Sequence, residues 1–188
     1  MRSLPLYFGC YAKHTFSIPA SQANASRHMS RDWIAFLIFF GVSFAVAASG
    51  SRFTATSVKT WYPGLLKPPG TPPPWVFGPV WTILYLLMAV AAWLVWRQRI
   101  QEDVQLALGL FMVQLILNGL WSFVFFGLRR PGAALVEIIV LLGAIAVTAM
   151  RFAEFSRLAF WLMTPYGAWV LYACYLNFGI WRLNKGTT

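Results

Sequence analysis

The chain has 188 residues, of which 59% are hydrophobic and only 11% are charged. A soluble domain typically carries about 25% charged residues, so this composition indicates a membrane protein. The net charge of +10 could suggest nucleic-acid binding, but the basic residues lie at the ends of apolar stretches, as lipid-anchoring side chains do. We therefore expect the lipid bilayer, and no nucleic acid, among its partners. These flanking residues are Arg97, Arg99, Arg129, Arg130, Arg151, Arg157, Arg182 and Lys185.

Residues 1–30 differ from the rest of the chain because they contain no acidic residue and no long apolar run. We expect them to form an N-terminal extension, for which three interpretations stay open. The extension is a disordered tail, a targeting segment of the transit type, or the product of a start assigned too early, with Met29 as the true first residue. The membrane domain is then expected to cover residues 31–184.

Five apolar stretches follow, each with about the 20 residues that an α-helix needs to cross a bilayer. None shows the polar and apolar alternation of a membrane β-strand. The predicted fold class is an all-α membrane protein, built as a single bundle of five transmembrane helices. The stretches are Asp32–Gly50, Trp75–Trp96, Val104–Leu128, Ala133–Met150 and Leu158–Trp181.

A long proline-rich loop is predicted between the first and second spans. Seven of the eleven prolines lie between Pro63 and Pro79. Because proline restricts the backbone, this loop has little conformational entropy to lose when it closes over a ligand. We interpret it as a semi-rigid lid that leads into a pocket wall. Pro79 lies in the next apolar run, where it either starts the helix or kinks it.

The spans contain almost no ionisable side chain. Glu137 is the only carboxylate well inside a span, and two interpretations stay open: a helix-start acid paired with nearby arginines, or a ligand-binding or proton-binding group. Both histidines, His14 and His28, lie in the extension, and Cys10 and Cys174 form neither a disulfide framework nor a metal knuckle. We therefore expect no metal, no cofactor and no firm catalytic residue.

Three spans carry aromatic and uncharged polar side chains on one helical face. Taken singly, such residues are typical of interhelical hydrogen bonds and of aromatic belts at the membrane interface. Taken together, they predict an apolar pocket with a few orienting hydrogen bonds, suited to a planar or polycyclic lipophilic ligand. The faces comprise Trp81 and Tyr85 in the second span, Gln114, Asn118 and Trp121 in the third, and Tyr166, Trp169, Ala173 and Asn177 in the fifth.

Several motifs along the chain carry a family resemblance. They are Trp61-Tyr62 with the prolines that follow, "WVFGPVWTILY", "QLILNGLWSFVFF" (Gln114–Phe126), "ALVEIIVL" (Ala134–Leu141) and "PYGAWVLYACYLNFGIWRLN" (Pro165–Asn184). With these motifs in order over residues 32–184, the chain resembles the tryptophan-rich sensory protein / translocator protein family (TspO/MBR, also called the peripheral-type benzodiazepine receptor family).

The resemblance implies a five-helix bundle, usually a homodimer, with a lid loop over a pocket. It implies a receptor, sensor or carrier for porphyrins and haem-like tetrapyrroles, sterols and benzodiazepine-type drugs, which regulates tetrapyrrole or stress responses. One alternative is an enzyme that degrades porphyrin in light, with Trp81 and Trp169 as participants, and another is a sterol-binding transport protein. The membrane is expected to be a bacterial envelope, with the mitochondrial outer membrane as the alternative.

The residues expected to bind ligand form one set, drawn from the helical faces and from the resemblance. The resemblance adds Trp61 and Tyr62 in the lid, and it matches Ala173 to a small residue that shapes the pocket. Sterol-binding members carry a tyrosine near the C-terminus where this chain has Phe178, so we expect sterol binding to be weakened. The predicted set is Trp61, Tyr62, Trp81, Tyr85, Gln114, Asn118, Trp121, Tyr166, Trp169, Ala173 and Asn177.

Overall fold

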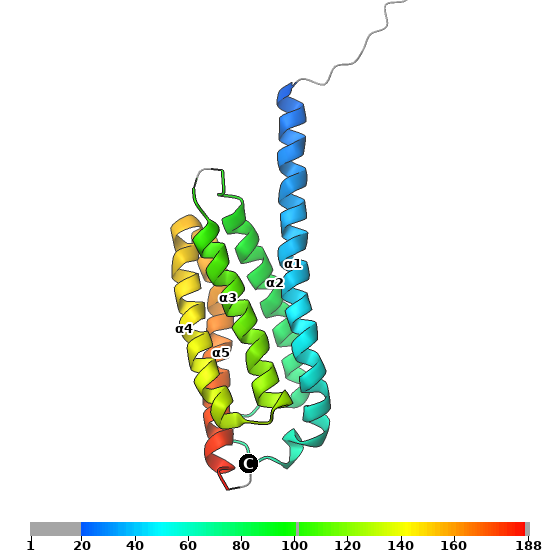
Figure 1. The fold of residues 1–188 in the computed structure, drawn as a ribbon, viewed down its shortest axis with the longest axis vertical. Coiled ribbons are helices and arrows are strands. Elements are labelled where there is room, and N and C mark those ends of the chain that lie inside the picture. The colour runs from blue at the N-terminus through cyan, green and yellow to red at the C-terminus, as the bar shows by residue number, and fades with distance from the viewer. Residues whose placement is uncertain (1–19, 101, 187–188) are drawn as a thin grey trace, which may run out of the picture.

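The computed structural model describes residues 20–100 and 102–186, and within these ranges the chain is helical, without a strand. Five α-helices run up and down a bundle (Figure 1), which confirms the predicted all-α fold. Short 3-10 turns at Tyr62–Gly64 and Pro74–Val76 lie between the first two helices, and a π-helical turn at Phe123–Gly127 follows the third. The helices are α1 (Ala20–Thr60), α2 (Phe77–Trp96), α3 (Gln105–Ser122), α4 (Pro131–Phe155) and α5 (Arg157–Leu183).

Four helical segments are long and apolar enough to cross a membrane, counting only the described residues. Their most apolar windows have mean hydropathies between 1.8 and 2.4. Helix α5 has 27 residues and is also long enough, but Asn177 and tyrosines such as Tyr166 and Tyr172 make it less apolar. The chain is a multi-pass integral membrane protein. The four segments are Met29–Thr60, Pro74–Trp96, Gln105–Gly127 and Pro131–Phe155.

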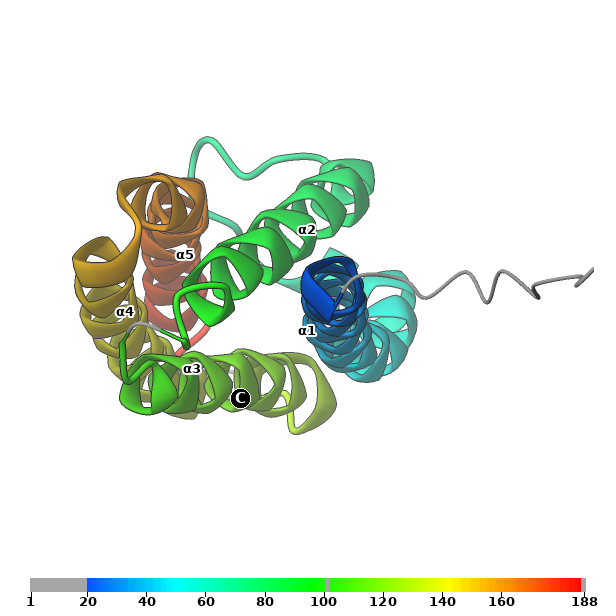
Figure 2. The ribbon, with the colours of Figure 1, turned by 90° about the horizontal axis from the view of Figure 1, so that it is seen from above.

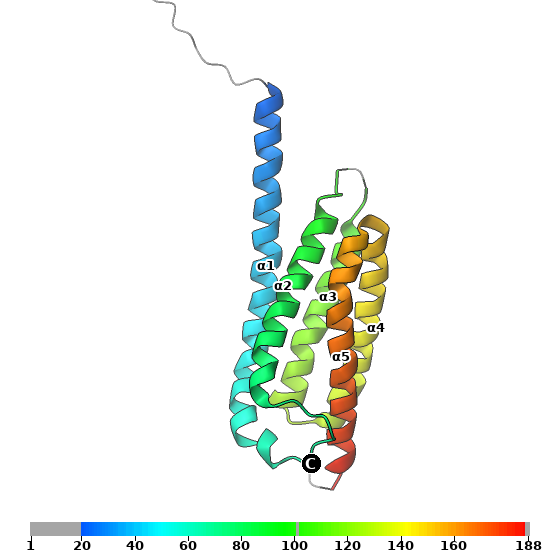
Figure 3. The same ribbon diagram turned by 180° about the vertical axis from the view of Figure 1, so that it is seen from behind.

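Helix α1 begins at Ala20, inside the segment expected to be an extension, and continues without a break into the first span. Its first turns project beyond the other helices (Figures 1 and 3). Where α1 meets the end of α2, the Asp32 carboxylate accepts a hydrogen bond from Arg99 and the Asp32 carbonyl accepts one from Trp93, each at 2.9 Å. Residues 1–19 lie outside the described residues, and the origin of residues 1–30 stays a prediction.

Proline and serine mark the starts of three helices. Pro79 lies in the first turn of α2, where its missing N–H removes no intrahelical hydrogen bond, so it belongs to the start of the helix. Pro131 occupies the first position of α4. Ser156 separates α4 from α5 and caps the latter, because its Oγ accepts a hydrogen bond from the Ala159 N–H at 3.3 Å.

Helices α4 and α5 lie on one side of the bundle and α1 on the other, with α2 and α3 between them (Figure 2). Large side chains fill the core among α2, α3, α4 and α5. The rings of Phe111 in α3 and Phe152 in α4 stack with their centroids 6.0 Å apart, and both are fully buried, as are Met88 of α2 and Met163 of α5. Close packing of this kind is a main source of helix association in lipid.

Helix α1 packs against the end of α3 through small residues. A Cβ atom added to Gly50 would lie 3.1 Å from the Oγ of Ser122, and one added to Gly119 would lie 3.2 Å from Val46. The hydroxyl of Ser57 donates a hydrogen bond to the backbone carbonyl of Phe126, in the turn after α3, at 2.6 Å. These contacts hold α1 against α3 and leave space between α1 and the start of α2.

Candidate functional site

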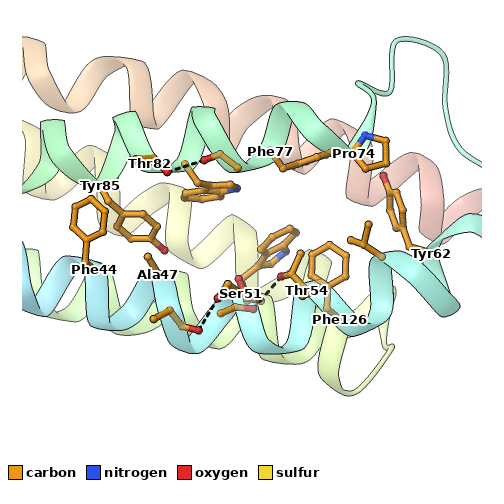
Figure 4. Close-up of a pocket in the computed structure, with 18 of the residues that line it drawn as sticks. Phe44, Ala47, Ser51, Thr54, Tyr62, Pro74, Phe77, Thr82, Tyr85 and Phe126 are labelled. Carbon is orange, nitrogen blue, oxygen red and sulfur yellow. Dashed lines mark hydrogen bonds between the residues drawn. The ribbon is translucent and has the colours of Figure 1, made fainter.

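A cavity of about 530 Å³ lies between the second half of α1 and the start of α2, with the end of α3 as a third wall (Figure 4). We call it the helix cavity. Its volume falls in the range of about 300–1,000 Å³ that is usual for small-molecule sites. Aromatic and aliphatic side chains make up most of its walls. They include Phe44 and Ala47 of α1, Phe77 and Trp81 of α2, and Trp121 and Phe126 near the end of α3.

Aromatic rings close one end of the helix cavity, and its side is open. At the closed end, Phe44 of α1 contacts Tyr85 of α2 with ring centroids 6.3 Å apart. Along the side, the lining residues Ala48 and Ser51 of α1 and Thr82 of α2 are exposed. In a bilayer, this arrangement opens the cavity laterally between the two helices.

Trp81 is the tryptophan of α2 that lines the helix cavity, and it is half-buried. Its ring centroid lies 5.6 Å from that of Tyr85 and 6.2 Å from that of Tyr166 in α5. Trp121 of α3 also lines the cavity and stacks on Phe125, with centroids 5.2 Å apart. Phe125 belongs to the π-helical turn, an element that is frequent at functional sites.

A buried hydrogen-bond chain connects α2, α3 and α5 next to this aromatic wall. The hydroxyl of Tyr85 donates to Oδ1 of Asn118, and Nδ2 of Asn118 donates to the hydroxyl of Tyr166 at 3.0 Å. All three side chains are buried. A satisfied buried network favours one arrangement of the helices, so it holds the aromatic wall in place.

A second chain connects α3, α4 and α5. The indole Nε1 of Trp121 donates to Oδ1 of Asn177 at 3.1 Å, and Nδ2 of Asn177 donates to the carbonyl of Pro131 at 2.7 Å. Because Asn177 has both an acceptor and a donor in use, its amide orientation is set by its neighbours. The ring of Trp121 is thereby fixed at the wall of the helix cavity.

The proline-rich loop is held against α5 by hydrogen bonds. The Asn184 side chain accepts a hydrogen bond from the N–H of Leu66 at 3.1 Å and donates one to the carbonyl of Leu66 at 2.9 Å. The hydroxyl of Tyr172 donates to the carbonyl of Gly70 at 2.5 Å. Gly70 has a φ of +82°, a left-handed conformation that glycine adopts at little cost, and this bend lets the chain turn back toward α2.

Packing adds to these hydrogen bonds. Pro68 is buried against Gly179, where an added Cβ atom would lie 2.6 Å from the proline ring. The hydroxyl of Tyr175 donates to the carbonyl of Pro69 at 3.1 Å. The middle of the loop is therefore a strap on α5, whereas Tyr62 and Pro74 at its two ends line the helix cavity.

Four of the eleven predicted ligand-binding residues line the helix cavity: Tyr62, Trp81, Tyr85 and Trp121. Three others form the hydrogen-bond chains beside it, namely Asn118, Tyr166 and Asn177. The structure therefore brings seven of the predicted residues into one region, although the amides support the wall and do not line the cavity. A ligand-binding role for each of them stays a prediction.

The remaining four predicted residues lie outside the helix cavity. Trp61 contacts Phe125, with ring centroids 5.8 Å apart, and Trp169 contacts Phe77, which does line the cavity, at 6.0 Å. Ala173 packs against the core. Gln114 is fully buried, and neither polar atom of its side chain has a hydrogen-bond partner within the described part of the chain.

The sequence predictions placed no binding residue on α1, which forms one wall of the helix cavity. The α1 residues that face it are mostly small, and they recur at helical spacing. Small residues opposite aromatic ones leave space between two helices that otherwise run close together. The run of small residues on one face of α1 was therefore the sequence signal for this wall of the cavity. The small residues are Ala47, Ala48, Gly50, Ser51, Thr54 and Ala55.

Tyr62 and Glu137 differ in their surroundings. Burial raises the pKa of the Tyr62 phenol above its ordinary value, and nearby Tyr172 adds to this effect, so the phenol is a neutral donor at physiological pH. The carboxylate oxygens of Glu137 are buried and have no partner among the described residues. Of the two interpretations left open for Glu137, the pairing with arginines is therefore wrong: Arg129 and Arg130 are exposed and precede α4, whereas Glu137 lies about two turns inside it.

Comparisons with known proteins agree with this architecture. The model of the TspO/MBR family matches residues 39–182. The chain is 44% identical over 140 residues to the tryptophan-rich protein TspO of Archaeoglobus fulgidus, covering 74% of this chain and 90% of that protein. It is 42% identical over 139 residues to the translocator protein of Homo sapiens, covering 73% and 82%, and 38% identical over 156 residues to the tryptophan-rich sensory protein of Cereibacter sphaeroides, covering 83% and 95%. The chain belongs to the TspO/MBR family.

Proposed function

We propose that this protein is a membrane receptor, sensor or carrier that binds a tetrapyrrole such as protoporphyrin in the helix cavity. The observation that carries the proposal is the cavity itself, which measures about 530 Å³, has aromatic walls and opens sideways between α1 and α2. A tetrapyrrole is flat and largely apolar, so it can stack on aromatic rings and reach the cavity from the bilayer.

The hydrogen-bond chains support the same proposal. Tyr85 and Trp121 line the helix cavity, and each is held by an asparagine on a neighbouring helix. A wall that is ordered before the ligand arrives loses little entropy on binding. The names of two relatives, a translocator protein and a tryptophan-rich sensory protein, are consistent with a carrier or receptor role.

Titration of the purified protein in lipid nanodiscs with protoporphyrin tests the proposal. We expect saturable binding that weakens up to about tenfold in Trp81→Leu, because an aromatic contact is worth about 0.5–1.5 kcal/mol. Trp161→Leu is the matched control, since this residue of α5 is 64% exposed and does not line the cavity. Unsaturable binding, or equal affinities of wild type and Trp81→Leu, would contradict the proposal.

A second candidate function is light-dependent breakdown of the bound porphyrin. One observation favours it: the readily oxidised indole of Trp81 lines the helix cavity. Irradiation of the complex should then bleach protoporphyrin faster than irradiation in detergent alone, and Trp81→Phe should remove the difference. Equal bleaching rates would exclude this candidate.

The partners proposed for the chain are a porphyrin, a second copy of itself and, more weakly, a sterol. Exposed small residues on α4, such as Gly143 and Ala146, permit close helix contact in a homodimer. Sedimentation of the detergent-solubilised protein tests the dimer, and Gly143→Leu should raise the monomer fraction. Phe178 is 44% exposed and offers no hydroxyl to a sterol, so the sterol should bind more weakly than protoporphyrin.

A further inference from the structure

A second cavity, of about 400 Å³, lies beneath the proline-rich loop. We call it the loop cavity. Val58, Tyr62 and Pro74 line both cavities, so the two adjoin along these residues. The helix cavity lies between transmembrane helices, whereas most residues that line the loop cavity belong to the loop between the first two spans. Together they make one elongated site, whose loop end combines proline walls with the polar side chains of Tyr62, Lys67 and Thr71.

Three hydrogen-bond donors line the two adjoining cavities: Lys59, Lys67 and Tyr62. Lys59 lines the helix cavity and has neither a hydrogen bond nor an ion pair with any described residue. Lys67 lines the loop cavity, donates to the carbonyl of Leu65 at 3.1 Å, and has its Nζ 4.8 Å from the ring centroid of Tyr62.

Tyr62 is the third donor, and it lines both cavities. Its side chain is buried, with only 6% of the residue exposed, yet its hydroxyl has no hydrogen-bond partner in the described part of the chain. The hydroxyl oxygen is not one of the fully buried polar atoms that lack a partner, so it is accessible from the cavities and can donate to a bound ligand. Because burial keeps the phenol protonated, the group at this point is an O–H donor.

Four of the five acidic side chains lie away from this end of the bundle. The chain has five acidic residues in total, all of them described. Asp32 is paired with Arg97 and Arg99, just after α2 ends, and Glu154 is paired with Arg151 in the last turns of α4, so both lie at the opposite end of the bundle. Glu102 and Asp103 also lie there, between α2 and α3, whereas Glu137 is buried in α4 about two turns from the loop end. The cations at the loop end, by contrast, are Lys59, Lys67, Arg129, Arg130, Arg182 and Lys185.

We propose that the site selects amphiphilic anions, with the flat apolar body in the helix cavity and a carboxylate bound at the other end by Lys59, Lys67 and Tyr62. The inference rests on the proposed function in one respect, that the ligand occupies the helix cavity. Charge-assisted hydrogen bonds to a carboxylate are shorter and stronger than neutral ones. A nearby excess of positive charge, partly shielded from water, strengthens them further.

A pair of probes separates charge from shape. Protoporphyrin IX carries two carboxylates on one edge, and its dimethyl ester keeps the macrocycle without the charges. The measured quantity is the ratio of the two dissociation constants in nanodiscs of zwitterionic phosphatidylcholine. Partition of each probe into lipid affects every variant equally, so differences in this ratio between variants report on the protein alone.

The variant to compare is the double substitution Lys59→Met, Lys67→Met. We expect the preference for the acid over the ester, measured as the ratio of their dissociation constants, to be about tenfold larger in the wild type than in this variant. Methionine keeps the apolar stem of lysine and removes the charge, so the affinity for the ester should not change. Lys185→Met is the control, because Lys185 lies at the same end, with its Nζ 3.9 Å from the ring centroid of Trp181, and lines neither cavity.

Two further readouts distinguish recognition from a structural role. Tyr62→Phe keeps the ring and removes the donor, so it should weaken binding of the acid about threefold and leave the ester unchanged. Raising the salt concentration should weaken binding of the acid to the wild type. The same change should have little effect on the ester, or on the acid bound to the double lysine variant.

The outcomes also separate this inference from the proposed function. Equal acid-to-ester ratios in wild type and double variant, or parallel losses for acid and ester, would overturn the inference while the tetrapyrrole proposal stands. If neither porphyrin binds, 1-pyrenebutyrate and its methyl ester replace them. A lysine-dependent preference for the pyrene acid would then support anion selection without the tetrapyrrole, and absence of that preference would overturn both.

Discussion

Helices α1 and α2 meet in two different ways along their length. Toward the end of α2, rings fill the contact: Trp33 stacks on Trp93 with centroids 6.5 Å apart, and Phe39 meets Trp96 at 6.3 Å. Beyond the pair formed by Phe44 and Tyr85, the α1 residues become small and the helix cavity begins. The same two helices are therefore closed at one end and open at the other.

The difference between the two ends shows that the helix cavity results from the small size of the α1 side chains that face α2. Aromatic residues continue on α2 through Trp81 and Phe77, so the change lies on α1, where Ala47 and Ser51 replace rings. The hydrogen bonds at Asp32 hold the closed end, and the contact of Gly50 with Ser122 holds α1 against α3 at the open end. The helices are fixed on both sides of the space, so it does not collapse.

The largest expected effect comes from breaking the closed end. Trp93→Ala removes the stacking of the Trp93 ring on Trp33 of α1 and a 2.9 Å hydrogen bond to the Asp32 carbonyl. We expect the free energy of unfolding to fall by about 3 kcal/mol, measured by denaturation in detergent. Trp161→Ala, which truncates a lipid-exposed ring, should change it little. If both variants lose the same free energy of unfolding, the contact at the closed end does not stabilise the bundle more than a lipid-exposed ring does.

Filling the open end should remove ligand binding without loss of stability. Ala47→Phe places a ring in the helix cavity, so affinity for protoporphyrin should fall about 30-fold, or about 2 kcal/mol. Ala45→Phe is the matched control, because Ala45 is exposed and does not line the cavity. If the two variants bind protoporphyrin equally well, the ligand lies elsewhere.

The amide of Asn118 sharpens the comparison, because it supports the wall from outside the cavity. Asn118→Leu leaves the hydroxyls of Tyr85 and Tyr166 without their partner, and the free energy of unfolding should fall by about 1 kcal/mol. Adding Tyr166→Phe should restore part of that loss, since one orphaned hydroxyl disappears. Additive losses in the double variant would mean that the hydrogen bond does not couple the two residues.

The smallest expected effect concerns the strap. Gly179→Val forces atoms into the Pro68 ring, so the loop should leave α5 and become more sensitive to proteolysis. Affinity for protoporphyrin should fall about threefold, because the polar end of the site loses its cover. Gly109→Val is the control, since an added Cβ atom there meets nothing within 4 Å. An unchanged rate of cleavage in Gly179→Val would show that the strap does not depend on this contact.

The sequence predicted the parts of the fold that depend on local chemistry. Apolar length identified the helices, and of the two roles left open for Pro79, a place at the start of the helix is the one it has in α2. Helical spacing also grouped Gln114, Asn118 and Trp121 on one face, because spacing within a helix needs no knowledge of its neighbours.

The rest depends on how the helices are rotated against one another. Asn118 bonds to tyrosines on two other helices, whereas Gln114, one turn away, has no partner in the described part of the chain. Spacing alone does not separate these two amides. It also does not show that Trp81 lines the cavity while Trp169 contacts Phe77 from outside it.

Nuclear magnetic resonance of protein labelled at its alanine methyl groups tests most directly whether the ligand occupies the helix cavity. Protoporphyrin strongly shifts the signals of methyl groups that lie against its ring. Ala47, Ala48 and Ala55 line the cavity, whereas Ala134 and Ala149 are buried in α4. We predict large shifts for the first three signals and little change for the other two. Shifts confined to α4 and α5, with the α1 signals unmoved, would contradict the account.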